Sequence, residues 1–146
     1  MTKPLNTREL VKKIENQYST AIVDFQDSFV TITPESVYDV CLLLNHSSGL
    51  EFDYLVDLTG VDYLDYIAVV YRLVSIKHNH GVIIKTRCFD RKKPIVPSVT
   101  PIWKGADLME REVYDMLGVY FEGHYNMKRL LLWEGFEGHP LRRDFL

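Results

Sequence analysis

Residues 52–89 constrain the fold most, because they hold three successive runs whose side chains alternate with the period of a β-strand. The runs begin at Phe52, Tyr66 and Val82, and the last two are separated by a His-Asn-His-Gly stretch typical of a turn. Strands joined by short connections pair antiparallel. In the first run, one face is expected to hold Phe52, Tyr54, Val56 and Leu58, and the other Asp53, Leu55, Asp57 and Thr59.

Helical and strand periods on both sides of this segment complete the pattern. Thr7 is expected to cap the first helix and Thr33 the second, where Pro34 suits the first turn. A third helix ends at Gly118, since glycine suits the left-handed conformation that closes many helices. The expected helices cover residues 7–18, 34–45 and 106–117, and two further strands cover residues 21–25 and 29–33.

The resulting order, α-β-β-α-β-β-β-α, predicts an α+β protein with two layers: a mixed, mainly antiparallel sheet with helices on one face. A chain of 146 residues fits one domain. Residues 1–118 are expected to form its body, and residues 119–146, which lack a sustained period, an extended C-terminal interaction arm. The longest strongly apolar run, residues 66–71, is far too short to span a bilayer.

Charge is distributed unevenly along the chain. The net charge of −3 argues against a general nucleic-acid binder. Residues 77–100 nevertheless contain one acid, Asp90, and six bases. This strip is either a surface for an acidic partner or a nearby anionic phase, or a solvated edge strand protected by cations. The bases are Lys77, Lys85, Arg87, Arg91, Lys92 and Lys93.

The third expected helix carries charges on two sides. On a helical wheel its core face consists of Ala106, Met109, Val113, Met116 and Leu117. The opposite face is expected to carry an i, i+4 ion-pair ladder of Asp107, Arg111 and Asp115. Glu110 lies at the margin of the apolar arc, where a carboxylate must be paired or pay for desolvation. It is either half-exposed at the core boundary or functional.

A tetrapeptide, Phe-Glu-Gly-His, occurs twice in the arm, at residues 121–124 and 136–139. Each copy is followed by a basic pair, Lys128-Arg129 or Arg142-Arg143. Glycine supplies a turn, and the cationic groups suit carboxylates. Two interpretations remain open: the arm anchors the chain to a partner, or it wraps its own domain.

A catalytic interpretation has less support. Glu110, Glu112, His124 and His139 are the groups of a metal hydrolase, but the two glutamates project about 200° apart on a helix. HExxH, phosphate-loop and nucleophile-elbow motifs are absent. The two cysteines are far apart and are expected to be reduced thiols. A stand-alone metal-dependent hydrolase therefore remains only as an alternative.

The segment from Glu110 to Val119, followed by Phe121, Gly123-His124 and Arg129, resembles a known signature. It is that of the NuoC-type subunit of NADH:quinone oxidoreductase, the family of the mitochondrial thirty-kilodalton subunit of respiratory complex I. Residues 58–63, 96–103 and 138–145 also resemble family segments, so the likeness covers roughly residues 50–146.

The resemblance implies an α+β fold and a cofactor-free, hydrophilic subunit in the peripheral arm of a proton-translocating complex. The parent complex would use FMN, iron–sulfur clusters, NADH and quinone. The implied partners are the D-type and B-type subunits of complex I, with the ferredoxin-like subunit as a further candidate, on the cytoplasmic side of a prokaryotic membrane. The implied structural and interface residues are Glu110, Arg111, Glu112, Asp115, His124, Arg129, His139, Arg142, Arg143 and Asp144.

Three departures from the family pattern widen the choice of parent complex. Tyr125 and Asn126 stand where the family usually has a proline and an acid, and residues 104–107 replace a more apolar lead-in. The family often continues well beyond the position of Phe145. A homologous subunit of a hydrogenase, or of an F420- or ferredoxin-linked dehydrogenase complex, is the second expectation.

Overall fold

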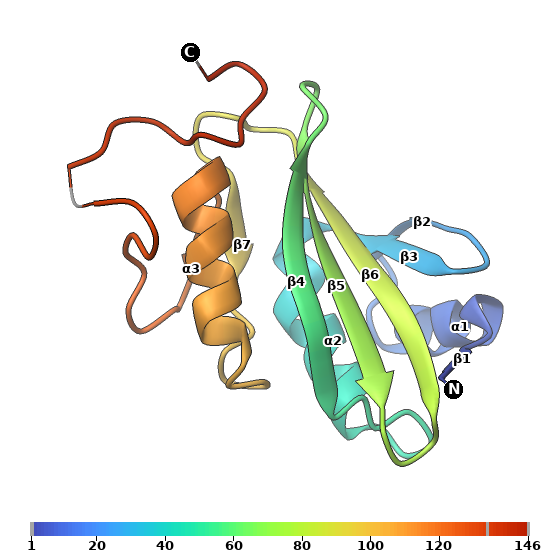
Figure 1. The fold of residues 1–146 in the computed structure, drawn as a ribbon. Coiled ribbons are helices and arrows are strands. Elements are labelled where there is room, and N and C mark those ends of the chain that lie inside the picture. The colour runs from blue at the N-terminus through green and yellow to red at the C-terminus, as the bar shows by residue number, and fades with distance from the viewer. Residues whose placement is uncertain (1, 134, 146) are drawn as a thin grey trace.

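The computed structural model describes residues 2–133 and 135–145. Its main sheet contains β1 (Lys3–Pro4), β2 (Ile22–Phe25), β3 (Phe29–Ile32), β4 (Tyr54–Asp62), β5 (Ile67–Ser75) and β6 (His80–Cys88). Five strands follow the order β2-β3-β6-β5-β4, and β1 pairs with the start of β6 (Figure 1). β6 runs parallel to β1 and β3, and the other pairs are antiparallel.

The helices are α1 (Thr7–Gln17), α2 (Val37–His46) and α3 (Ala106–Leu117), with a 3₁₀ turn, η1 (Pro34–Ser36), before α2. α1 and α2 cover one face of the sheet, and α3 lies beside β4 (Figure 1). A separate parallel pair, β7 (Ile95–Pro97) and β8 (Tyr120–Glu122), flanks α3 in sequence. In the described part of the chain, no helix is both long and apolar enough to cross a membrane.

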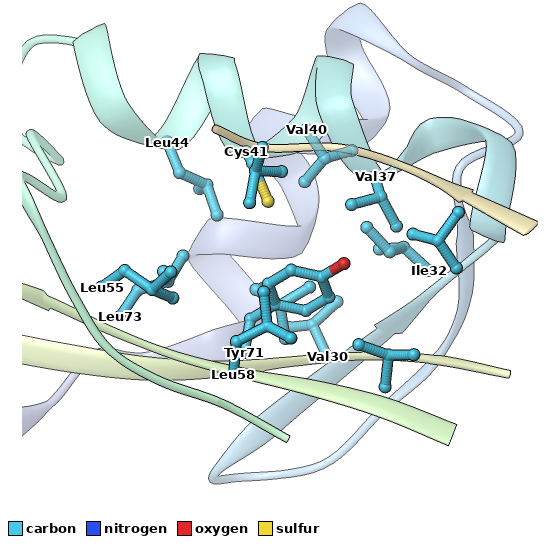
Figure 2. Packing of buried hydrophobic residues seen from close by; sticks show 14 of the residues in the cluster. Val30, Ile32, Val37, Val40, Cys41, Leu44, Leu55, Leu58, Tyr71 and Leu73 are labelled. Carbon is cyan, nitrogen blue, oxygen red and sulfur yellow. The ribbon is translucent and has the colours of Figure 1, made fainter. Parts of the chain in front are cut away.

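The core lies between α2 and the sheet (Figure 2). α2 directs Val37, Val40, Cys41 and Leu44 toward the Tyr71 ring of β5. All five side chains are fully buried, and each aliphatic one contributes about 1.5–3 kcal/mol by leaving water. Helices with such apolar faces must cover a sheet, which accounts for the two layers.

Gly60 sets the distance between α3 and the edge strand β4. A Cβ atom at this position would collide with Leu117 Cδ1 and would lie 3.1 Å from Val113 Cγ1. The missing side chain therefore lets the apolar face of α3 pack directly on the strand. This contact fixes the helix that carries most of the charged residues of the signature.

The structure confirms the α+β class and the mixed, mainly antiparallel sheet, and all eight expected elements are present. The strands β1, β7 and β8 were not expected from the sequence. β7 holds Pro97 and β8 lies in the arm, and each forms only through pairing with a segment distant in sequence. Thr7 is not the cap of α1: the Asn6 side chain accepts from the Arg8 N–H, and Thr7 donates to the Gln26 carbonyl.

The expected alternation of the first run is wrong. Leu55 and Leu58 point into the core, whereas Tyr54 and Val56 are exposed. A β-bulge between Leu55 and Asp57 is the cause, because one extra residue inverts the side-chain faces along a strand.

Much of the basic strip is neutralised within the domain. Lys77 pairs with Glu51 and Arg87 with Asp24, at 3.2 Å in both cases. Lys85 Nζ lies 3.8 Å above the centre of the Phe29 ring. The strip is therefore not a continuous cationic surface, which favours the second of its two interpretations.

Candidate functional site

Glu110 is completely buried, at 0 % exposure, not half-exposed at the core boundary. Its carboxyl group accepts from the Ser98 hydroxyl at 2.7 Å and from the Val99 N–H at 2.8 Å. Burial raises the pKa of Glu110 to about 7 against the opposing effect of these two donors, and the nearby Asp107 adds to the rise. Glu110 thus ties α3 to the segment that follows β7.

Asp115 is the second buried carboxylate of α3, and the expected ladder with Arg111 is wrong. Its oxygens accept from Arg129 Nη1 at 2.9 Å and from the backbone N–H groups of Leu131 and Leu132 at 2.7 and 2.9 Å. Burial by itself raises the pKa of Asp115, but these donors outweigh it and hold the pKa below its usual range. The carboxylate therefore fixes the bend of the arm.

Arginine side chains of the arm and of α3 bind main-chain carbonyls within the domain. Arg111 donates to the carbonyls of Lys128 and Arg129 at 3.2 and 2.9 Å. Arg142 Nε donates to the Leu117 carbonyl at 2.6 Å, which satisfies an orphan acceptor at the end of α3. The arm thus wraps its own domain, as the second of its two interpretations expected.

The two Phe-Glu-Gly-His copies hold the two ends of α3. Gly123 and Gly138 share a left-handed φ of 89°. The His124 Nδ1 accepts from a backbone N–H, so its Nε2 carries the hydrogen and donates to the Asp107 carbonyl at 3.1 Å. The same nitrogen lies 3.0 Å from an Asp107 carboxylate oxygen, a contact of a neutral ring and not an ion pair.

His139 repeats this role at the other end of the helix. Its Nδ1 lies 3.1 Å from the Asp115 carbonyl and donates to it. Burial lowers the pKa of His139, so its ring is neutral at neutral pH. The duplicated motif is therefore a pair of helix clasps, a use that the sequence alone did not reveal.

A third carboxylate, Asp62 at the end of β4, was not expected from the sequence to be a site residue. It accepts from both Nη atoms of Arg91 and from the backbone N–H groups of Leu64 and Arg143. Arg91 also lies 3.4 Å from the Asp144 carboxylate. These contacts hold the pKa of Asp62 far below its usual range, chiefly through Arg91. Asp62 thus latches the end of the arm to the sheet.

Replacing Arg91 is expected to loosen this latch. Arg91→Ala leaves a nearly buried carboxylate with two backbone donors, which is expected to lower the free energy of unfolding by about 1–3 kcal/mol. A depressed pKa gives stability that is present above the unfolded pKa and lost as pH falls through the folded one. The difference between variant and wild type, measured by urea unfolding, is therefore expected to shrink as the pH falls below about 4.

The control for this latch is Lys92→Ala, which removes a neighbouring exposed cation that makes no side-chain bond to the rest of the described chain. It is expected to leave stability unchanged. Equal unfolding curves for Arg91→Ala and Lys92→Ala would contradict the latch.

The groups of the alternative metal hydrolase do not converge. Glu110 faces Ser98, His124 faces Asp107 and His139 faces the Asp115 carbonyl, while Glu112 is exposed. Within residues 2–133 and 135–145, no three histidine, cysteine or acidic groups are placed to hold a metal ion. The side chains of Arg143 and Asp144 are exposed at the end of the arm.

Comparison with known proteins identifies relatives of this arrangement. The family described as "Respiratory-chain NADH dehydrogenase, 30 Kd subunit" matches residues 30–146. A C-type NADH-quinone oxidoreductase subunit of Rhizobium meliloti, the second of that name, is 43% identical over 117 residues, covering 78% of this chain and 63% of that protein. The mitochondrial NADH dehydrogenase [ubiquinone] iron-sulfur protein 3 of Candida albicans is 40% identical, covering 80% and 42%.

A solved structure shares the fold across nearly the whole chain. It belongs to the membrane-bound sulfane sulfur reductase, an archaeal respiratory membrane complex, with a TM-score of 0.75 and 27% identity. The match covers 95% of this chain and 85% of that one. The chain thus spans about two-fifths to two-thirds of the length of the curated relatives, and most of the archaeal chain.

Proposed function

The chain belongs to the family of the 30 Kd subunit of respiratory-chain NADH dehydrogenase, and from this premise we propose that it is a structural subunit of such a complex. In this proposal it binds no cofactor, forms part of the hydrophilic peripheral arm, and helps assemble the module that passes electrons to quinone. Its activity is that of the parent complex, a proton-translocating NADH:quinone oxidoreductase on the cytoplasmic side of the membrane. FMN, iron–sulfur clusters and the NADH and quinone sites belong to other subunits.

The observation that carries this proposal is the division of labour within the arm. Its polar groups are bound to α3 and β4, but Leu131 and Trp133 are 62% and 68% exposed beside the Asp115 contact. Ordered, exposed aromatic and aliphatic side chains are typical of interface anchors. The arm therefore both wraps its domain and offers a fixed apolar surface to a partner.

The chemistry of the two cysteines supports a cofactor-free role. Cys41 and Cys88 are buried, on α2 and β6, and burial raises the pKa of Cys88 to about 11. Burial raises the pKa of Cys41 still further. Both are protonated thiols at neutral pH, whereas cluster and metal ligation require thiolates.

The proposed partners are the D-type and B-type subunits of complex I, with the ferredoxin-like subunit as a further contact. In this assignment the interface residues include Glu112, Arg143 and Asp144, which are exposed. Glu110, Arg111, Asp115, His124, Arg129, His139 and Arg142 act indirectly, by shaping the arm. The likeness to the archaeal complex supports a second candidate, a homologous subunit of a related respiratory complex with another electron donor or acceptor.

The test is assembly of the parent complex with arm variants. Leu131→Ser combined with Trp133→Ser is expected to keep the isolated domain folded, because both side chains are exposed. It is expected to lower the amount of assembled complex on a native gel by about tenfold or more, since interface anchors contribute about 2 kcal/mol each. Circular dichroism of the purified domain checks the fold.

Val23→Ser combined with Ile76→Ser is the matched control, since these side chains are 53% and 66% exposed far from the arm. This control is expected to assemble normally. Normal complex levels with the arm variant would reject the arm as an interface. Failure of the wild-type chain to co-purify with any other subunit would reject the proposed function itself.

A further inference from the structure

A groove of about 230 Å³ runs between the edge strand β4 and helix α3. Its floor includes the side chains of Met109, Met116 and Leu141, and its rim includes Asp57 and Glu112. Among the described residues, no lysine, arginine or histidine lines it. The groove is therefore apolar at the bottom and acidic at the edge.

Glu112 is the part of the Glu-Arg-Glu signature that the domain does not use. Glu110 is bound to Ser98 and Val99, and Arg111 is bound to two carbonyls of the arm. Glu112 is exposed, and no hydrogen bond or ion pair reaches its side chain from residues 2–133 or 135–145. An acid of the signature is thus left available to a partner at the rim of the groove.

The opposite rim also offers acceptors. The Asp57 carboxylate receives the N–H of the following residue, Leu58, at 3.0 Å and lies next to the β-bulge of β4. β4 pairs only with β5 among the described strands, so its outer side is an unpaired strand edge. Because α3 packs directly on Gly60, this edge is too closely covered to receive another strand. A side chain, by contrast, can enter the groove from above.

We propose that this groove receives an arginine or lysine side chain, flanked by an apolar residue, from a neighbouring subunit of the complex. This proposal rests on the proposed function. The methionines and Leu141 pack against the aliphatic stem and the apolar neighbour, since methionine adapts to varied shapes. Glu112 and Asp57 pair with the cationic head. The charge of the rim selects a basic partner, and the floor selects its apolar surroundings.

Cross-linking in the assembled complex tests this occupant directly. A photo-reactive amino acid at Leu108, which is 56% exposed one turn before Glu112 on α3, leaves both rim carboxylates in place. It is expected to cross-link to a segment of another subunit that contains arginine or lysine beside an apolar residue. The same group at Glu15, exposed on α1, is the control and is expected to give no such product.

A charge reversal gives an independent readout. Glu112→Lys is expected to weaken retention of the neighbouring subunits in salt washes by about tenfold or more, because like charges would face each other. Glu15→Lys makes the same charge change on α1 and is expected to have no effect. Both variants are expected to show wild-type thermal unfolding as isolated domains, since both positions are exposed.

The outcomes separate the groove from the proposed function. If wild-type chain assembles but Leu108 yields no product, a second copy of this chain or a segment without a basic residue, the groove proposal is overturned. Equal retention of Glu112→Lys and Glu15→Lys overturns it too. If the wild-type chain does not assemble at all, the proposed function fails, and with it the premise of the groove.

Discussion

Asp115→Ala is expected to lower the free energy of unfolding by about 3–5 kcal/mol, because it removes one partner of a buried, multiply bonded charge pair. Arg129 loses the carboxylate it meets at 2.9 Å, and the backbone N–H groups of Leu131 and Leu132 lose their acceptor. The arm should then detach from α3. Urea unfolding measures the loss, and limited trypsin digestion should cut after Lys128 or Arg129 much faster than in the wild type.

Two further variants delimit this result. Glu112→Ala removes an exposed carboxylate from the same helix and is expected to change stability by less than about 0.5 kcal/mol. Asp115→Asn keeps one acceptor oxygen and should fall between alanine and wild type. If Asp115→Ala resisted trypsin as well as the wild type does, Asp115 would not be what holds the arm.

The second large effect concerns Glu110 and depends on pH. Its pKa of about 7 in the folded protein lies above the ordinary value of 4.5, so the folded state binds the proton more tightly than the unfolded state. Stability is then greatest below the unfolded pKa and declines as pH rises toward the folded pKa. Between about pH 5 and about pH 8 this group is expected to remove about 2–3 kcal/mol from the wild type.

Glu110→Gln should abolish this part of the pH dependence. A glutamine has nearly the same shape and can accept from the Val99 N–H while donating to the Ser98 hydroxyl oxygen. The variant is expected to gain on the wild type steadily as the pH rises, in urea unfolding at several pH values. Glu112→Gln, on the exposed side of α3, is the control. Parallel stability curves for Glu110→Gln and wild type would show that burial does not perturb Glu110.

The elements of the fold were predictable because periodicity follows from burial. β6 alternates as expected, with Val82, Ile84, Thr86 and Cys88 buried, and α3 begins and ends at the predicted residues. The alternation of β4 failed because a bulge leaves no clear mark in the sequence. β7 and β8 were missed because three-residue parallel pairs depend on contacts between distant segments.

The site was predictable in its members but not in their roles. The motif drew attention to Glu110 and Asp115, yet a helical wheel placed Asp115 on the solvent face, since it takes no account of a segment folding over the helix. Asp62 was overlooked because its partners, Arg91 and the Arg143 N–H, come from three separate segments. Pairings of this kind are decided by tertiary structure, which spacing along the chain does not encode.

The two clasps on α3 leave slack between them. Asp107 and Asp115 are eight residues apart, or about 12 Å along the helix axis. The chain between His124 and His139 could extend about 50 Å. The surplus length forms a loop whose feet are fixed and whose crown carries Leu131 and Trp133. Insertions in the crown would cost little, because loop closure depends weakly on length, whereas one residue added to α3 would turn the second foot by about 100°.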